Sequence, residues 1–318
     1  MRLGFAVKVL GAGGLASHDT RRWQSGPDLS VSLDRLDAIL GHLDAHDLRF
    51  YRMATALAPY ASHPDLPQFR DQPARCSGRL AEVGARATAL GIRLTSHPGQ
   101  YTVLNSEDAE VQRLAAVELE VQAELMDGMG LGAESVVVLH VGSAAGGAQG
   151  AFDRFARGFE LLSDPARARV VVENDDRSFG LRDVVELSER IGRPVVWDIL
   201  HHHCHDPDRI PDAEALELAL ATWPHDVTPK IHFSTPRTDV EERARRVGRR
   251  VERSLVLPQP RAHADTIDPF AFEGFLAEAG AAGVRDFDVM LEAKAKDLAL
   301  LRLRAQLAAR GRLAALPV

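Results

Sequence analysis

The chain has 318 residues, of which 45% are hydrophobic and 26% charged, and its formal net charge is −7. This composition is typical of a globular protein, and the acidic balance argues against indiscriminate binding to nucleic acid, which depends on basic surface. No apolar stretch approaches the roughly 18 residues of a membrane span, and the short glycine-rich N-terminus does not resemble a signal peptide. Two cysteines, Cys76 and Cys204, provide no disulfide framework, so we expect a protein of the reducing cytoplasm.

Short apolar runs alternate with longer amphipathic segments along the chain. The apolar runs predict strands at residues 2–7, 48–53, 92–96, 135–141, 169–173, 194–199, 229–234 and 286–292. The amphipathic segments predict helices at residues 32–46, 74–90, 107–130, 151–163, 181–191, 212–222, 239–253, 268–280 and 295–310. Eight strands that are each followed by a helix predict an α/β fold, a single (β/α)8 TIM barrel that comprises residues 1–318.

The predicted helix at 239–253 is a local exception to the acidic balance. Its segment EERARRVGRRVER contains six arginines: Arg243, Arg245, Arg246, Arg249, Arg250 and Arg253. Two interpretations of this segment stay open. One is a solvated helix with Glu–Arg pairs, and the other is a local basic patch that binds nucleic acid.

Residues that can ligate metals lie where the predicted strands end. They are His97, His140, Glu173, Asp198, His201, His232, His263 and Glu292. A TIM barrel places its chemistry at the carboxyl ends of its strands. Imidazoles and carboxylates crowded together there would repel one another or lack partners unless cations neutralised them. The pattern therefore predicts a metal cluster at the C-terminal face of the barrel.

The types of ligand restrict the metal. Imidazole and carboxylate without thiolate favour Mn²⁺, Zn²⁺ or Fe²⁺ over Ca²⁺ or a structural zinc. Eight ligands exceed the need of one ion, so we expect two or three ions with Glu173 as a bridging carboxylate. Clusters of this kind clamp the attacking and leaving oxygens of a phosphodiester, or generate hydroxide at neutral pH.

Neighbouring residues of two of these ligands need separate interpretation. In the segment WDILHHHCH, we expect Asp198 and His201 to point inward and the three other histidines to surround the cluster or face solvent. Lys230 precedes His232 by two residues, so both side chains share one face of the strand. A lysine beside a cationic cluster is repelled unless it is neutral or modified. Two hypotheses stay open: Lys230 is carboxylated and acts as an acceptor near the metals, or it is an ammonium that contacts a phosphate.

Short motifs follow one another along nearly the whole chain. They are RLGF (2–5), ASHP (61–64), HPGQY (97–101), VVVLHVG (136–142), VVEND (171–175), WDILHH (197–202), KIHFS (230–234), HADTID (263–268) and MLEAKAKD (290–297). Together they resemble the UV damage endonuclease family. The combined pattern is specific, although each motif alone is weak.

The resemblance implies a TIM barrel with a groove over its C-terminal face. It implies hydrolysis of the DNA backbone immediately 5′ to a lesion, notably a pyrimidine dimer or a 6-4 photoproduct, by up to three metal ions, usually manganese, held by the eight residues above. Lys230 matches a lysine that can be modified, Gln100 and Tyr101 match residues that wedge into DNA opposite the lesion, and His63 matches a histidine near the scissile phosphate. The implied partner is damaged double-stranded DNA, and we expect a monomer that associates with the nucleoid through DNA.

The first predicted strand departs from the family pattern. Relatives commonly have a tyrosine and, four residues later, an asparagine, whereas this chain has Phe5 and Val9. In the family those polar groups lie by the lesion pocket, so the departure puts the range of lesions in doubt. Stacking of an aromatic face on an unpaired base supplies about 1–3 kcal/mol, and Phe5 is therefore predicted to probe the lesion.

Other functions compete with this interpretation. A metal-dependent sugar isomerase or epimerase places the same residue types at the strand ends of the same barrel, but it needs neither a DNA wedge nor a basic rim. An abasic-site endonuclease has a similar cluster. A DNA-binding module that is only stabilised by metal would not need an open mouth with so many ligands.

Overall fold

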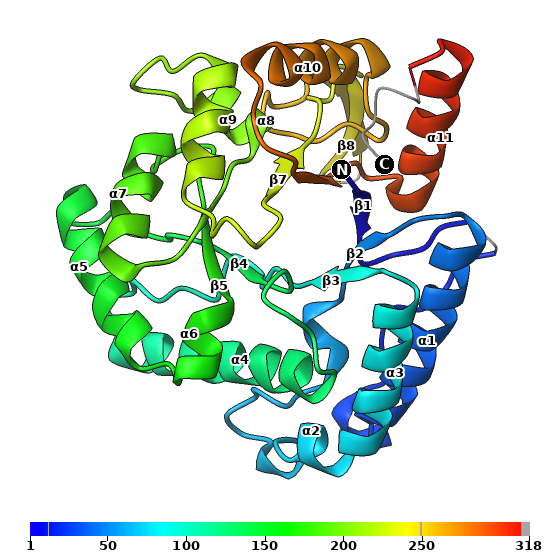
Figure 1. Cartoon of the computed structure of the whole chain (residues 1–318), viewed down its shortest axis with the longest axis vertical. Coiled ribbons are helices and arrows are strands. Elements are labelled where there is room, and N and C mark those ends of the chain that lie inside the picture. The colour runs from blue at the N-terminus through cyan, green and yellow to red at the C-terminus, as the bar shows by residue number, and fades with distance from the viewer. Residues whose placement is uncertain (12, 249, 313–318) are drawn as a thin grey trace.

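Eight parallel strands form a ring at the centre of the fold (Figure 1). They are β1 (Leu3–Ala6), β2 (Phe50–Arg52), β3 (Arg93–Thr95), β4 (Val137–His140), β5 (Val170–Glu173), β6 (Val195–Val196), β7 (Lys230–Phe233) and β10 (Asp288–Leu291). Hydrogen bonds order them β3-β2-β1-β10-β7 in one sheet and β4-β5-β6 in another. The parallel bridges Ser96↔Val137 and Asp198↔His232 join the two sheets at both ends. The ring is therefore closed, and the predicted (β/α)8 barrel is confirmed.

Helices surround the ring on its outside (Figure 1). The α-helices are α1 (Leu29–Ala45), α2 (Gln72–Arg75), α3 (Ser77–Ala89), α4 (Ala109–Gly128), α5 (Gly147–Glu160), α6 (Asp164–Arg169), α7 (Leu181–Ile191), α8 (Ile199–Cys204), α9 (Asp212–Ala221), α10 (Pro269–Ala282) and α11 (Lys296–Ala309). The short 3₁₀ helices are η1 (Trp23–Ser25), η2 (Thr55–Leu57) and η3 (Pro67–Phe69). The computed structural model describes residues 1–11, 13–248 and 250–312. The predicted single domain, residues 1–318, therefore includes some residues outside these ranges. None of the described helices has the length and apolarity that a bilayer span requires.

Local capping residues define where several of these helices begin and end. The carboxylates of Asp28, Asp108 and Asp268 accept hydrogen bonds of 2.8–2.9 Å from backbone N–H groups two residues further on. These bonds satisfy amides that the first turn of a helix leaves free. Helices α7 and α10 end at Gly192 and Gly283, whose φ angles of 63° and 64° are left-handed. Glycine adopts this conformation without steric cost, and the chain turns back toward the next strand.

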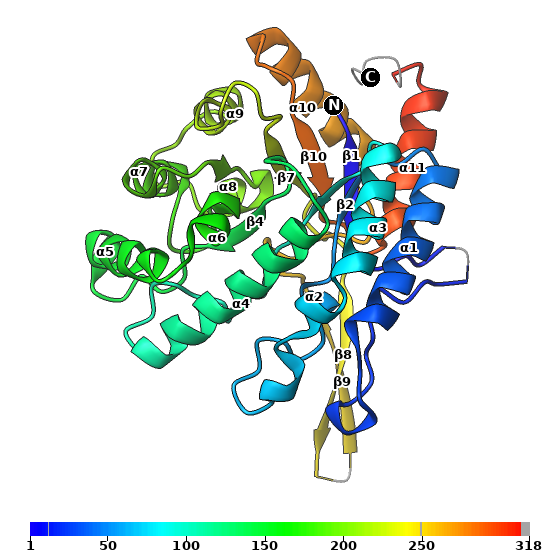
Figure 2. The same cartoon turned by 60° about the horizontal axis from the view of Figure 1, so that its bottom comes forward.

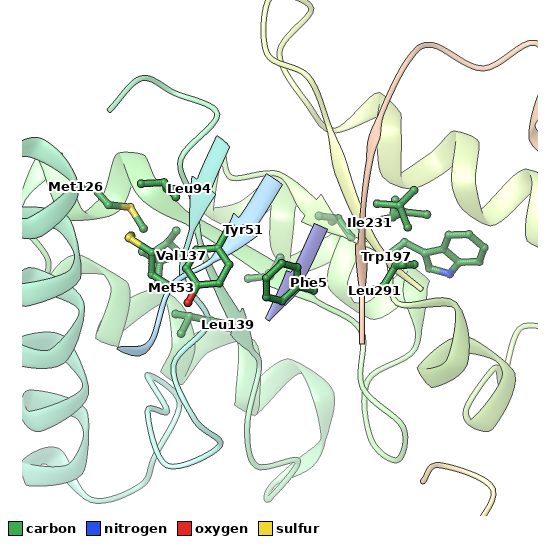
Figure 3. Close-up of a cluster of buried hydrophobic side chains, with 14 of the residues drawn as sticks. Phe5, Tyr51, Met53, Leu94, Met126, Val137, Leu139, Trp197, Ile231 and Leu291 are labelled. Atoms are coloured by element: carbon green, nitrogen blue, oxygen red, sulfur yellow. The ribbon is translucent and has the colours of Figure 1, made fainter. Parts of the chain in front are cut away.

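Alternation of side chains along the strands divides the interior into two layers. Ala6, Phe50 and Met290 pack together inside the barrel. Phe5 and Tyr51 belong to the larger core between the strands and the helices, and their ring centroids lie 5.4 Å apart (Figure 3). Phe5 is fully buried there. The prediction that Phe5 probes the lesion is therefore wrong, because its position in the strand directs it away from the inside of the barrel.

The predicted helix at 239–253 is also wrong, because this segment is an antiparallel hairpin. Strands β8 (Glu241–Val247) and β9 (Arg250–Val256) pair along their whole length. Gly248 has a φ of 61°, the left-handed conformation that a two-residue hairpin turn requires; Arg249 lies outside the described residues. Gly248 between two valine-containing segments was the sequence signal for a turn. The spacing of glutamate and arginine favoured a helix instead.

Candidate metal centre

The predicted ligands converge on the C-terminal face of the barrel. Those within a strand, or at most two residues after one, are His97, His140, Glu173, Asp198, His232 and Glu292. Asp198 caps the N-terminus of α8, its carboxylate accepting a 2.8 Å hydrogen bond from the backbone N–H of His201. His263 pairs with Pro236 at the base of the hairpin. Parallel strands thus bring together residues that are far apart in the chain.

Glu173 lies at the centre of this group and is fully buried. One carboxylate oxygen, Oε1, lies 2.7 Å from Nδ1 of His232 and 3.7 Å from Nδ1 of His201. The other, Oε2, lies 2.9 Å from Nε2 of His97 and 3.7 Å from Nε2 of His140. A carboxylate with two imidazoles at each oxygen is placed to bridge two cations.

Glu292 forms a second carboxylate position beside the first. Its Oε1 lies 3.5 Å from Nδ1 of His232, and its Oε2 lies 3.7 Å from Nδ1 of His263. Arg52, at the end of β2, forms an ion pair with the same carboxylate. Arg52 stands at the end of a strand, as the ligands do. The sequence analysis did not select it, because a guanidinium is positively charged and does not ligate metals.

Seven of the eight predicted ligands group into sets whose donor atoms lie within 4.8 Å of one another. The sets are His97–His140–Glu173, His97–His232–Glu292 and Glu173–Asp198–His201. Several of their buried atoms have no hydrogen-bond partner: Oε2 of Glu173, Oδ2 of Asp198, Nε2 of His232, Nδ1 of His97 and Nδ1 of His140. Unsatisfied buried polar atoms are costly and rare. Divalent cations bound among these nitrogen and oxygen donors would satisfy some of them, so the residues fit the predicted metal cluster.

Neighbouring residues orient the ligands. Asn174 follows Glu173, and its side-chain amide accepts a 2.8 Å hydrogen bond from the backbone N–H of Asp198 and donates one of 3.0 Å to the carbonyl of the same residue. The carbonyl of Asn174 lies 3.0 Å from Nδ1 of His201. Asn174 therefore links two ligand-bearing segments. The sequence analysis missed it, although it stands inside the VVEND motif.

The remaining histidines of WDILHHHCH lie outside the three sets. His202 is buried, and its Nε2 lies 2.8 Å from the carbonyl of Ile210. His203 is exposed, and its Nε2 lies 2.8 Å from a carboxylate oxygen of Asp212. His202 and His203 thus have partners of their own, as expected for residues that surround the cluster or face solvent, and His205 also lies outside the three sets.

Burial and charge together determine the protonation of the centre. Burial raises the pKa of Glu173, but the imidazoles of His232, His140 and His97 outweigh it and hold the pKa well below its usual range. Burial lowers the pKa of both His97 and His232. An ionised carboxylate between neutral imidazoles is the protonation state that binds divalent cations.

His201 is the exception, and it leads to a testable prediction. Burial lowers its pKa, but the carboxylates of Asp198, Glu173 and Glu292 outweigh burial and raise the pKa to about 9. His201 therefore carries a proton at pH 7.5, which it must lose to ligate a metal. We expect Mn²⁺ binding at pH 7.5 to release about one proton from His201, and Mn²⁺ affinity to rise between pH 6 and 9.

Titration calorimetry in buffers of different ionisation enthalpy measures this release. His201→Gln should release less, whereas His225→Gln, which changes an exposed histidine, should match the wild type. Equal release by all three proteins would refute the assignment.

Three of the residues predicted to contact DNA, His63, Gln100 and Tyr101, lie at the same face but outside the three sets. Tyr101 is 84% exposed, and Gln100 and His63 are also exposed. A cavity of about 850 Å³ is lined by Gln100 together with the candidate ligands His140 and His201. The HPGQY loop thus lies between the candidate ligands and the exposed surface of the protein.

Fold and site together define a (β/α)8 barrel with a candidate cluster of metal ligands at its C-terminal face. The family model described as UV-endonuclease UvdE matches residues 30–316. The UV DNA damage endonuclease of Bacillus cereus (strain G9842) is 29% identical over 279 residues, which cover 87% of this chain and 81% of that protein. The chain belongs to the UV-endonuclease UvdE family, and this membership identifies it as a DNA repair endonuclease.

Solved structures agree with this assignment. The crystal structure of SacUVDE superposes with a TM-score of 0.79 at 30% identity and covers 98% of this chain and 100% of that one. D-psicose 3-epimerase from Clostridium cellulolyticum H10 has a TM-score of 0.56 at 13% identity, with 100% of both chains covered. The epimerase therefore shares the fold alone.

Proposed function

We propose that this protein is a metal-dependent hydrolase that nicks the DNA backbone 5′ to UV photoproducts, including pyrimidine dimers and 6-4 photoproducts. The main support is the buried carboxylate of Glu173 with four imidazoles within 3.7 Å, next to a cavity that His140 and His201 line. Family membership supports damaged double-stranded DNA as the substrate. We further propose that the whole chain acts as one domain, as a monomer, in the cytoplasm at the nucleoid.

Two or three divalent ions, which we propose to be Mn²⁺, would be held by the eight predicted ligands and would supply hydroxide at neutral pH and stabilisation of charge on phosphate oxygens. The residues that would hold them are His97, His140, Glu173, Asp198, His201, His232, His263 and Glu292. Glu173 would bridge two ions. His63 would contact the scissile phosphate from the loop after β2.

Lys230 is fully buried beneath the ligands, with its Nζ 5.7 Å from the centroid of the Phe50 ring. Burial, assisted by the charges of Arg52 and Arg93, holds the pKa of Lys230 well below its usual range. A neutral amine is the form that reacts with CO₂, so we propose that Lys230 is carboxylated. Absence of the added CO₂ from a native mass spectrum of protein that was never acidified would contradict this proposal.

Gln100 and Tyr101 would fill the gap that a rotated-out lesion leaves in the duplex. The exposed ring of Tyr101 supports this role, since it is available to stack on a base. We expect Tyr101→Ala to lower the nicking rate on UV-irradiated duplex by about 10- to 100-fold, which corresponds to the roughly 1–3 kcal/mol of one base–aromatic stack. Tyr101→Phe is the matched control, and because it keeps the ring it should retain most of the rate. Equal loss in both variants would exclude stacking as the cause.

A plasmid-nicking assay tests the proposed function. Incubation with Mn²⁺ should nick UV-irradiated plasmid, leave intact plasmid closed, and produce 3′-hydroxyl and 5′-phosphate ends at the 5′ side of each photoproduct. Nicking of abasic plasmid alone would indicate an abasic-site endonuclease. Turnover of a ketose without nicking would indicate a sugar epimerase, whose barrel this chain shares.

A further inference from the structure

The β8–β9 hairpin is a solvent-exposed ribbon that projects from the barrel (Figure 2). Every described residue from 242 to 255 is exposed. Some of the exposed residues are large and apolar, with Leu255 at 77% and Val251 at 61% exposure. The side chains of the ribbon bury little apolar surface, so the ribbon adds little to the hydrophobic core. Its surface is therefore available for binding.

The ribbon also differs from the rest of the chain in charge. Residues 241–256 contain six arginines and three glutamates, a net charge of +3, in a chain whose net charge is −7. Only two of these arginines form ion pairs within the described hairpin: Arg253 with Glu242 at 2.9 Å and Arg243 with Glu241 at 3.8 Å. Arg249 lies outside the described residues, and no carboxylate of the described residues forms an ion pair with the remaining three, which are Arg245, Arg246 and Arg250. Three guanidinium groups are therefore free for an anionic partner.

Pairing in the hairpin places these charges on both of its faces. Directly opposed residues of an antiparallel pair share a face. Arg245 is opposed to Glu252 and Arg246 to Val251, so successive arginines point to opposite sides. Seven residues per strand give a ribbon about 24 Å long, which matches roughly seven base pairs of duplex. The major groove of B-DNA admits a two-stranded ribbon, and phosphates flank it on both sides.

The base of the hairpin is anchored beside the candidate metal centre. The backbone N–H of Arg237 donates to the carbonyl of Ala262 at 2.6 Å, and that of Ala264 donates to the carbonyl of Thr235 at 2.9 Å. The guanidinium of Arg237 lies 3.0 Å from the carboxylate of Asp265. The ribbon thus leaves the rim between β7 and the segment that contains His263. A duplex that reaches the centre would pass alongside it.

We propose that the β8–β9 hairpin is an arm that binds the phosphate backbone of duplex DNA flanking the lesion, without regard to its sequence. This proposal rests on the proposed function, because DNA is the polyanion that the metal centre would act on. The arm binds the undamaged flank, whereas the HPGQY loop contacts the lesion. It therefore contributes to affinity and to the salt dependence of binding, and not to the chemical step.

The test compares the wild type with the triple variant Arg245→Gln, Arg246→Gln, Arg250→Gln. Binding is measured by fluorescence anisotropy without added metal, on lesion-containing duplexes that extend about two helical turns or only about half a turn on each side. We expect a loss of affinity of about 10- to 100-fold on the long duplex, little loss on the short one, and a fall of about 2–3 in the slope of log K against log salt. The nicking rate at saturating DNA should not change.

The matched control removes three arginines from the outer helices. Its changes are Arg157→Gln, Arg182→Gln and Arg302→Gln, which alter the net charge equally. If the hairpin variant and this control had equal affinity and equal salt slope, the proposal would be overturned. So would unchanged affinity together with altered sedimentation, since the hairpin would then be a contact between copies of the chain. Because binding is measured without nicking, a failure of the proposed function would leave this result interpretable.

Discussion

Replacement of Glu173 by glutamine is expected to lower the nicking rate on UV-irradiated plasmid by about 10³-fold, while DNA binding stays measurable. The amide preserves the size of the side chain but removes the charge that lies within 3.7 Å of four imidazoles. Without a bridging carboxylate the centre loses the ligand shared by two of its three sets. The measurement is single-turnover nicking in Mn²⁺, with affinity determined separately by anisotropy.

The matched control for this variant is Glu160→Gln. Glu160 is the exposed last residue of α5, on the outside of the barrel, and its replacement should leave the rate unchanged. Retention of full nicking by Glu173→Gln would rule out the bridging role. A loss of DNA affinity as large as the loss of rate would instead indicate a disrupted fold.

Replacement of Asp288 by alanine is expected to lower the free energy of unfolding by about 3–5 kcal/mol, the usual cost of breaking a buried ion pair from one side. Asp288 starts β10, and its Oδ2 accepts a 2.8 Å hydrogen bond from the fully buried guanidinium of Arg93 and one of 2.9 Å from Arg2. Carbonyls of Thr228 and Pro229 also accept from Arg93, but they cannot balance its charge. Urea or guanidinium unfolding measures the change.

Asp286→Ala is the matched control, since it removes an exposed carboxylate two residues away. Changes at such exposed positions usually stay within about 0.5 kcal/mol. The double variant Arg93→Leu, Asp288→Leu should lose less stability than Asp288→Ala, because it leaves no buried charge unpaired. If the double variant were less stable than Asp288→Ala, packing and not the unpaired charge would be the cause.

Glu173→Gln and Asp288→Ala test the different roles of the two ends of the barrel. Glu173 closes β5 at the face that holds the candidate ligands, whereas Asp288 and Arg93 begin their strands at the opposite face. In TIM barrels the first face serves chemistry and the second serves stability. A variant at one end should therefore affect nicking with little change in unfolding, and a variant at the other end should do the reverse.

Much of the fold could be predicted from local patterns. Each observed barrel strand lies within a predicted apolar run, and α7 has the predicted bounds, residues 181–191. Strands buried on both faces give continuous apolar runs, and glycines that can adopt left-handed φ end helices. The hairpin at 241–256 was mistaken for a helix because charged, exposed residues have no apolar period that would distinguish the two structures.

The candidate site could be located but not assembled from the sequence. Parallel strands of a barrel all end at one face, so residue types at strand ends were sufficient to select the ligands. Distances such as the 2.7 Å between Glu173 and His232 depend on which strands are neighbours and on their register. Roles that depend on orientation were less predictable. Phe5 occupies the right strand but points to its outer face.

From the sequence alone we could infer the order of the eight barrel strands, the chemical types of the candidate ligands and the family resemblance, because these depend on local composition and spacing. The three-dimensional arrangement was needed to show which ligands share a carboxylate, that Phe5 is buried, that Arg52 and Asn174 contact the ligands, and that an arginine-rich hairpin lies beside them. These features arise from contacts between segments distant in the chain, and such contacts leave no local pattern that one sequence can reveal.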